Sequence, residues 1–220
     1  MRIVLKHIVA RTYRPMLVKY LSKTRRYNYK DIELEIPPEV FHPGFFSSTQ
    51  LLLRYIDTFP LQGKTFLELG AGSGLIAIHA AKKNAVVTAS DINPVAIEYL
   101  RKNSSRNKVK IEMIQSDLFK NILPTKFDTI AINPPYYKKQ PQSLLDHAWY
   151  CGENGEYFTK LFEQLTEYVH ESSAVIMVLC DGCDIAMIEK AAATNGFNFQ
   201  LMQTKQYLLE KNFIYKIGRK

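Results

Sequence analysis

Short apolar runs alternate with helical segments from Lys64 to the end of the chain. Each run has the length of a buried strand, and the segments between the runs carry apolar residues at helical spacing. This rhythm predicts an α/β fold in which a mostly parallel sheet is covered by helices on both faces. The predicted strands are Thr65–Leu69, Ala85–Ala89, Ile111–Ile114, Phe127–Ile132, Ala174–Cys180 and Phe213–Ile217.

Three helices are indicated by their ends or by an apolar stripe. Ser48 or Thr49 is predicted to cap a helix that Pro60 closes. Asn93 is predicted to cap a second helix, because Pro94 then occupies the first helical position, where its missing N–H costs nothing. The third helix, Glu156–Val169, carries a core stripe of Phe158, Leu161, Phe162, Leu165, Tyr168 and Val169.

The residues before this domain have a different pattern. Helical spacing over Arg2–Ser22, interrupted at Pro15, predicts two short helices. Apolar residues then alternate with polar ones over Tyr27–Ile36, which predicts a hairpin. We therefore expect a short helical and hairpin extension over residues 1–40 and a main domain over residues 41–220.

The composition is that of a globular protein, since 46% of the 220 residues are hydrophobic and 23% are charged. No apolar run approaches the roughly 18 residues that a membrane helix needs. An odd number of cysteines cannot complete a disulfide framework, and no apolar secretory segment lies near Met1. These features predict a cytoplasmic protein without membrane contact.

The net charge of +8 is concentrated near the N-terminus. The first thirty residues contain nine lysines and arginines and no acid, whereas the remaining chain has 20 basic and 21 acidic residues. Such a segment attracts polyanions, and we expect residues 2–30 to contact nucleic acid or a ribonucleoprotein. A solvated basic helix face and a targeting presequence are the alternative interpretations.

A glycine loop follows the first predicted strand of the main domain. Its sequence Glu68-Leu69-Gly70-Ala71-Gly72-Ser73-Gly74 lets the backbone approach a ligand closely. The spacing is G-x-G-x-G and not the G-x-G-x-x-G of dinucleotide sites. Glu68 would also repel a diphosphate, whereas it would favour a cofactor with a sulfonium or ammonium group. A generic tight turn is the alternative.

Two further acids follow the next two predicted strands. Asp91 lies 23 positions after Glu68, close to the roughly 20-residue interval at which such folds place an acid on ribose hydroxyls. Asp117 follows the third strand, where its carboxylate can accept from an adenine amino group while Leu118 and Ile92 sandwich the ring. Each acid alone is an ordinary loop residue, but acids at three successive strand ends indicate a nucleoside-type ligand.

The most specific motif is Asn133-Pro134-Pro135-Tyr136, directly after the strand Phe127–Ile132. Two prolines cannot donate to a sheet ladder, so the chain leaves the sheet here with exposed carbonyl oxygens. The Asn133 side-chain oxygen and the Pro134 carbonyl can accept hydrogens from a planar NH2 group, and Tyr136 can stack on it. A proline-rich turn is the alternative, but it does not account for the asparagine.

In this order and spacing, the glycine loop, the segments around Asp91 and Asp117 and the Asn-Pro-Pro-Tyr motif resemble the class I S-adenosylmethionine-dependent methyltransferases that modify planar amino nitrogens. They are most similar to the HemK-type enzymes and to the related methyltransferase small-domain family, whose members include enzymes acting on RNA bases. The resemblance covers about residues 41–218 and implies a Rossmann-like fold with seven strands and S-adenosyl-L-methionine as cofactor. It implies that Asn133, Pro134, Pro135 and Tyr136 are catalytic, and that Thr49, Glu68, Gly70, Ala71, Gly72, Gly74, Asp91, Ile92, Asp117, Leu118 and Asn133 bind the cofactor.

The acceptor is left open between two enzyme classes. The segment from Ala148 to Gly155 is similar to single-domain enzymes that methylate glutamine in translation proteins such as release factors or ribosomal proteins. The basic N-terminus favours an exocyclic amine of adenine or guanine in RNA or DNA instead. A non-catalytic RNA-binding protein on the same fold is the third hypothesis.

The remaining chemical motifs are interpreted as structural. Cys180 and Cys183 have redox-like spacing but follow a strand late in the chain, so we interpret them as buried or loop cysteines. The five histidines have no ligand spacing, and we expect no metal site. No hydrolase motif is present.

Overall fold

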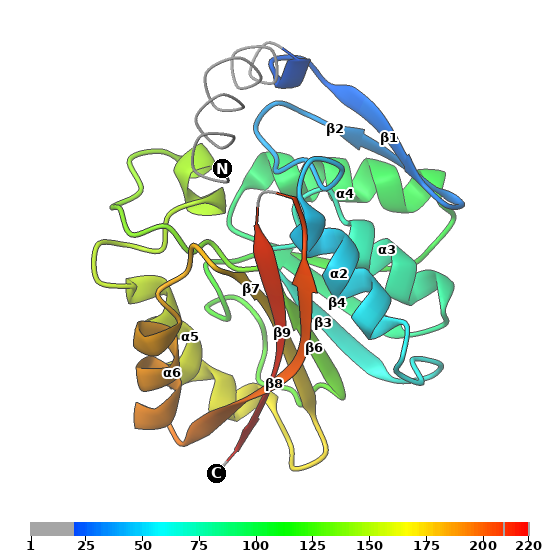
Figure 1. Ribbon diagram of the computed structural model, residues 1–220. Coiled ribbons are helices and arrows are strands. Elements are labelled where there is room, and N and C mark those ends of the chain that lie inside the picture. The colour runs from blue at the N-terminus through cyan, green and yellow to red at the C-terminus, as the bar shows by residue number, and fades with distance from the viewer. Residues whose placement is uncertain (1–19, 209, 220) are drawn as a thin grey trace.

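The computed structural model describes residues 20–208 and 210–219 (Figure 1). Almost all of the helical segment predicted over Arg2–Ser22 lies outside these residues. The predicted α/β fold is confirmed, because a seven-stranded sheet has the order β5-β4-β3-β6-β7-β9-β8. Six of its strands run in the same direction, and β9 runs antiparallel to them. Its strands are β3 (Thr65–Leu69), β4 (Val86–Asp91), β5 (Glu112–Gln115), β6 (Thr129–Ile132), β7 (Ala174–Cys180), β8 (Phe197–Gln206) and β9 (Lys211–Arg219).

The predicted strands agree with the observed ones to differing degrees. β3 and β7 have the predicted bounds, and the other four predicted strands overlap β4, β5, β6 and β9 with shifted ends. The edge strand β8 was not predicted. Only Phe197 in it is buried and most of its other residues are exposed, so this strand has no apolar run to reveal it.

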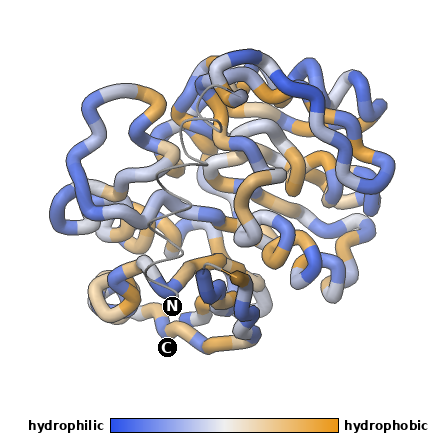
Figure 2. Tube along the Cα trace, turned by 45° about the horizontal axis from the view of Figure 1, so that its top comes forward, coloured by the Kyte–Doolittle hydropathy of each residue, from blue (hydrophilic) through white to orange (hydrophobic). Residues whose placement is uncertain are grey.

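Helices cover both faces of the sheet (Figure 1). Alternate strand residues point to opposite faces, so Phe66 of β3 joins one core and Leu67 joins the other. In Figure 2 long hydrophilic stretches follow the outer loops at the left and top of the view, and hydrophobic stretches alternate with them along the rest of the tube. One face carries α2 (Ser47–Ile56), α3 (Leu75–Lys82) and α4 (Pro94–Arg106), and the other carries α5 (Glu156–Leu165) and α6 (Ile185–Thr194).

Two predicted helix starts have different outcomes. The cap at Asn93 is confirmed, since its side chain accepts a hydrogen bond of 2.9 Å from the Val95 N–H. The cap predicted at Ser48 or Thr49 is wrong, because α2 already begins at Ser47. Its N-cap residue is Phe46, which makes no side-chain cap bond. The predicted third helix is confirmed in the main: α5 ends at Leu165, and a 3-10 turn, Thr166–Tyr168, continues it.

The predicted hairpin is confirmed as β1 (Arg25–Tyr29) and β2 (Ile32–Ile36), which pair antiparallel. Lys30 in its turn has a left-handed φ of 52°. The inner side chains of β2, from Ile32 to Ile36, are buried in the same core as α3 and α4. The division at residue 41 stays a prediction.

The connectivity creates a crevice at the middle of the sheet. From β3 the chain moves outward to β4 and β5, and it then returns to β6 on the other side of β3 and moves outward to β7. The segments that leave the carboxyl ends of β3 and β6 therefore diverge. Ligands of open α/β sheets bind at such a reversal of strand order.

Among the described residues, no helix is both long enough and apolar enough to cross a lipid bilayer.

Candidate functional site

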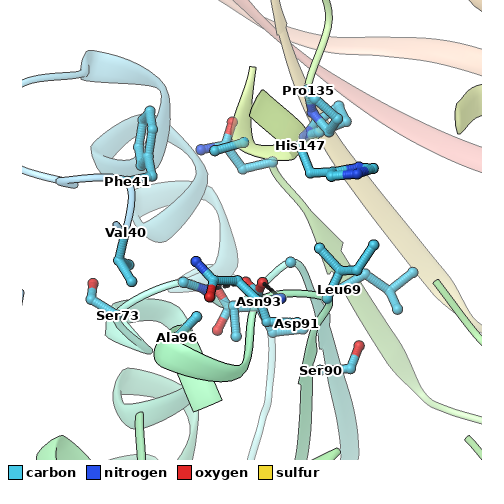
Figure 3. Close-up of a pocket in the computed structure, with 18 of the residues that line it drawn as sticks. Val40, Phe41, Leu69, Ser73, Ser90, Asp91, Asn93, Ala96, Pro135 and His147 are labelled. Atoms are coloured by element: carbon cyan, nitrogen blue, oxygen red, sulfur yellow. Dashed lines mark hydrogen bonds between the residues drawn. The ribbon is translucent and has the colours of Figure 1, made fainter. Parts of the chain in front are cut away.

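A single pocket at the carboxyl ends of the parallel strands brings the predicted motifs together (Figure 3). Every predicted site residue except Gly74 lines it. These residues are Thr49, Glu68, Gly70, Ala71, Gly72, Asp91, Ile92, Asp117, Leu118, Asn133, Pro134, Pro135 and Tyr136.

The glycine loop turns sharply after β3. The Gly70 and Ala71 N–H groups both donate to the Ser90 carbonyl at 2.9 Å, which holds the loop against the end of β4. Gly70 has a φ of 74°, and a side chain there would meet nothing within 4 Å, so the loop leaves open space above its backbone.

Gly74 has a packing role and does not line the pocket. It is the N-cap of α3 with a φ of 86°, and an added Cβ would lie 2.1 Å from Leu100 Cδ1 of α4. A side chain at this position would collide with Leu100 and would also be strained at this φ. Close packing is thus one reason for the third glycine, and its predicted role in cofactor binding stays a prediction.

Glu68 is a buried carboxyl at the floor of the pocket. Its side chain is 5% exposed, and Oε2 accepts a 2.7 Å hydrogen bond from the Ala77 N–H near the start of α3. Burial raises the pKa of Glu68 well above its usual value, and the nearby Asp91 raises it further. The pocket thus contains a carboxyl whose ionised form a cationic ligand would stabilise.

Asp91 links the glycine loop to the start of α4. Its Oδ2 accepts from the Gly72 N–H at 2.8 Å and its Oδ1 accepts from the Asn93 N–H at 2.9 Å. Burial nevertheless raises the pKa of Asp91 above its usual value. Each oxygen retains a second lone pair, so the carboxylate can also accept from two hydroxyl groups in the pocket.

Asp117 and Leu118 line the pocket beyond β5. The Asp117 side chain is 49% exposed, and one of its oxygens lies 3.9 Å from Lys160 Nζ. Leu118 has a left-handed φ of 51°, which is rare for a residue with a branched side chain, and its side chain is buried. This backbone turn directs an apolar group and an acid to the same side of the pocket.

Asn133 lies where β6 ends, opposite α2. Its Nδ2 donates to Thr49 Oγ1 at 3.3 Å, which fixes the orientation of the carboxamide. Because the oxygen and nitrogen of a carboxamide point in different directions, this contact turns Oδ1 away from Thr49. The prediction that Thr49 and Asn133 share one site therefore agrees with the geometry.

The end of the proline motif is fixed by backbone bonds. The Tyr136 and Tyr137 N–H groups donate to the Trp149 carbonyl at 3.2 and 3.0 Å. The two tyrosine rings lie 4.7 Å apart. Burial raises the pKa of Tyr136 far above its usual value, so its side chain stays a neutral phenol. The segment after β6 and the loop before α5 thus form one wall.

Several pocket residues were not assigned from the sequence. Val40 and Phe41 line one side of the pocket, and His147 lies across from them, beside Pro135 of the predicted motif (Figure 3). Trp149 lies 5.3 Å from the ring of Phe41. None of these residues belongs to a periodic pattern, and the only available signal was their place in loops next to the recognised motifs.

Tyr157 is a further residue of this kind. It lines the pocket from α5, and its pKa is raised by burial and by the nearby Asp91 and Asp117. The apolar stripe of this helix, which includes the neighbouring Phe158, marks the core face and does not indicate that Tyr157 lines a pocket.

Within the part of the chain that the structure describes, no three histidine, cysteine, aspartate or glutamate side chains are arranged to hold a metal ion.

Comparison with known proteins connects this pocket to methyl transfer. The methyltransferase small domain family matches residues 32–150. A Methanocaldococcus jannaschii protein, provisionally named a protein N5-glutamine methyltransferase, is 36% identical over 150 residues, which cover 66% of this chain and 74% of that protein. Ribosomal RNA small subunit methyltransferase C of Haemophilus influenzae is 36% identical over 129 residues, but these cover only 38% of its length.

Solved structures share the fold. Ribosomal protein L11 methylase of Lactobacillus delbrueckii subsp. bulgaricus has a TM-score of 0.59 and 26% identity, with 79% of each chain covered. The 16S rRNA N2 G1207 methyltransferase of T. thermophilus, solved with AdoMet and guanosine, has a TM-score of 0.69 and 18% identity, and covers 90% of this chain and 50% of that one. The chain thus belongs to the methyltransferase small domain family and is a class I S-adenosylmethionine-dependent methyltransferase.

Proposed function

We propose that the chain methylates a planar amino nitrogen, and that its acceptor is a glutamine side-chain amide in a translation-related protein such as a release factor or a ribosomal protein. The observation that carries the reaction class is the Asn133 carboxamide, which Thr49 orients at the end of β6 beside the pocket. The similarity to the provisionally named glutamine methyltransferase supports the amide acceptor.

The pocket fits S-adenosyl-L-methionine by the chemistry of its side chains. When bound, this cofactor supplies a methyl group made electrophilic by a sulfonium. Two carboxyls with pKa values raised by desolvation, the buried Glu68 and the partly buried Asp91, suit a ligand with cationic groups and hydroxyls and disfavour a diphosphate. We assign the methionine end to the loop at Gly70 and Gly72, where the backbone is open.

The nucleoside end is assigned to the acids that follow β4 and β5. Asp91 would accept from the ribose hydroxyls, since both of its oxygens are already held in place by backbone donors. Asp117 would accept from the adenine amino group. Ile92 and Leu118 also line the pocket, and on this assignment they would contact the faces of the ring.

The acceptor nitrogen is positioned by Asn133 and Pro134. An amide nitrogen is a poor nucleophile because its lone pair is delocalised, so both hydrogens must be held while the lone pair is turned to the methyl carbon. Asn133 Oδ1 and the Pro134 carbonyl oxygen supply two acceptors for these hydrogens. They also stabilise the positive charge that grows on nitrogen as the bond forms. The neutral Tyr136 side chain would cover the flat amide.

The alternative acceptor is an exocyclic amine of adenine or guanine in RNA or DNA. The basic segment over residues 2–30 and the similarity to ribosomal RNA small subunit methyltransferase C favour it. The same two oxygens would hold an aromatic NH2 group equally well. A non-catalytic RNA-binding protein is less favoured, because RNA binding alone would not require the Asn-Pro-Pro-Tyr motif in the pocket.

The test uses the purified chain, methyl-labelled S-adenosylmethionine and a fractionated cell extract. Label that protease releases and RNase does not would support the glutamine acceptor, and mass spectrometry of the protease fragments would locate the methylated residue. Label released by RNase or DNase would favour the base amine. No transfer into any fraction, with the donor bound, would overturn the enzymatic proposal.

A further inference from the structure

Two cysteines lie in one tight turn after β7, beside the proline motif. Cys183 Sγ lies 3.8 Å from Cys180 Sγ and donates to it. The Cys180 N–H donates to Cys183 Sγ at 3.2 Å, and the Gly182 N–H donates to Cys180 Sγ at 3.4 Å. The turn therefore folds the two sulfurs onto each other.

This environment favours the ionised form of one sulfur. The Cys183 thiol and the Gly182 N–H both donate to Cys180, and they lower the pKa of the Cys180 thiol to about 7 despite its burial. The same contact raises the pKa of Cys183, which keeps its proton. A thiolate next to a protonated thiol is the arrangement that oxidants convert to a disulfide.

The turn is joined to the acceptor side of the pocket at two points. The Tyr136 side chain lies near the Cys180 sulfur and helps to lower the pKa of that thiol. Further along the two segments, the Lys138 ammonium forms an ion pair with the Asp184 carboxylate, which directly follows Cys183. A change in the turn would thus be transmitted to Tyr136 and to the loop that follows it.

We propose that Cys180 and Cys183 are a modification site at which a hydroperoxide forms a reversible disulfide, and that this bond displaces Tyr136 and slows methyl transfer. The effect on transfer rests on the proposed function, whereas formation of the disulfide does not. The spacing of the two cysteines, interpreted from the sequence as structural, has this chemical use because the turn brings the sulfurs together.

The chemistry balances with hydrogen peroxide as the oxidant. The Cys180 thiolate attacks one peroxide oxygen, the O–O bond breaks, and a sulfenic acid and one water form after proton uptake. The Cys183 sulfur then attacks the Cys180 sulfur, and the sulfenic oxygen leaves as a second water. The two thiols lose two hydrogens and two electrons, and the peroxide gains them.

Bond formation requires a local movement of the turn. A disulfide is about 2.05 Å long, so the sulfurs must approach by somewhat under 2 Å. Disulfide formation also removes the thiolate beside Tyr136, since the bonded sulfur is uncharged and a much weaker acceptor. Cys183 is partly exposed and Cys180 is 5% exposed. The peroxide can therefore reach the Cys180 sulfur only when the turn opens.

The first experiment measures the modification alone. The full chain is treated with hydrogen peroxide, and free thiols are counted before and after addition of dithiothreitol. We expect the three thiols to fall to one and to recover fully, with a Cys180–Cys183 cross-link in the digested peptides. Cys151→Ser is the matched control, because Cys151 is buried and lies outside the turn; it should form the same cross-link. A cross-link through Cys151, or loss of thiols without a cross-link, would overturn the proposal.

The second experiment measures the coupling to the pocket. Trp149 is the only tryptophan, and its carbonyl binds the Tyr136 N–H, so its emission reports on this segment. We expect oxidation to shift the emission in the wild type and in Cys151→Ser, but not in Cys183→Ser. Transfer should fall on the order of tenfold, with donor affinity unchanged. Cross-linking without any change of emission or transfer would refute the coupling.

Discussion

Glu68, which is buried, and Asp91, which is partly buried, lie at the ends of neighbouring strands, and desolvation raises the pKa of both. Isolated buried carboxylates destabilise a fold, so such groups are kept when a ligand or a neighbouring donor stabilises them. Here the neighbouring donors are the backbone N–H groups of Ala77, Gly72 and Asn93. The remaining stabilisation is expected from a cationic ligand.

The Glu68→Gln variant tests this electrostatic cost. The pKa of Glu68 in the folded protein lies above its usual value of 4.5. Between these two pKa values the native state binds more protons than the unfolded state, so wild-type stability falls as the pH rises from 4.5 through the folded pKa. Glutamine still accepts from Ala77 but carries no charge. Urea unfolding from about pH 4.5 to pH 8 should therefore show a flatter pH dependence in the variant.

Asp31→Asn serves as its control, since the exposed Asp31 has a pKa lowered by Lys82. Its contribution is present at higher pH and is lost only as pH falls through the lowered pKa. This substitution should leave the slope above pH 4.5 unchanged. Parallel curves for wild type and Glu68→Gln would contradict a raised pKa at Glu68.

Asn133→Ala tests the role of the oriented carboxamide. Loss of one preorganised acceptor is expected to reduce transfer by on the order of 10² to 10³, while donor affinity changes only a few-fold. Single-turnover transfer and equilibrium binding of the donor measure the two effects separately. Thr49→Val, which removes only the group that Asn133 donates to, should give a smaller loss of transfer. Equal losses of binding and transfer in Asn133→Ala would mean that Asn133 holds the donor.

At the scale of elements, two asparagines attach the hairpin to the main domain: Asn103 in α4 and Asn107 at its C-cap. Asn103 donates to the Glu35 carbonyl at 3.0 Å and accepts from the Glu35 N–H at 2.8 Å, so its side chain pairs with β2 as a strand would. One turn later, Asn107 makes the same pair of bonds with Glu33. Asn103 also donates to the Ser73 carbonyl in the glycine loop at 2.9 Å.

Asn103→Ala should destabilise the fold far more than Asn107→Ala. Asn103 is fully buried, so its loss leaves Glu35 and Ser73 backbone groups without their side-chain partner, at about 1–3 kcal/mol for each unsatisfied group. Asn107 is partly exposed, and water can replace it. Urea unfolding of the two variants measures the difference. Similar values for both would show that the buried position has no special weight.

The elements that the sequence revealed are those with a complete apolar pattern. Every residue of β7 is buried, and its bounds were predicted correctly. β8 was not predicted, because it is a strand through its pairing with β9 and not through an apolar pattern of its own. The acids and glycines that line the pocket could be predicted because they directly follow strands with an apolar pattern. Phe41 and Trp149 line the same pocket from loops, and no periodic pattern predicts the path of a loop.

At the scale of the whole molecule, the charge is the feature that the pocket does not use. Removing residues 2–19 deletes five basic residues and leaves β1 intact. If this segment contacts nucleic acid, the deletion should weaken binding of an RNA oligonucleotide. It should also make the slope of log affinity against log salt concentration shallower, because several phosphate contacts are lost. Fluorescence anisotropy at four salt concentrations measures this slope.

The control for this deletion replaces the same five basic residues with glutamine in the full-length chain. Loss of binding in both proteins would assign the effect to charge. Binding that is lost only on deletion would assign it to the chain segment, and unchanged binding in both would exclude the segment as a nucleic-acid contact.

The reversal of strand order between β3 and β6 separates the sheet into two halves. On the proposed roles, the strands of one half hold the methyl donor and those of the other half choose what receives the methyl group. Mutations in the second half can therefore alter the choice without disturbing the first. One ancestral chain could in this way give rise to enzymes for proteins and for nucleic acids.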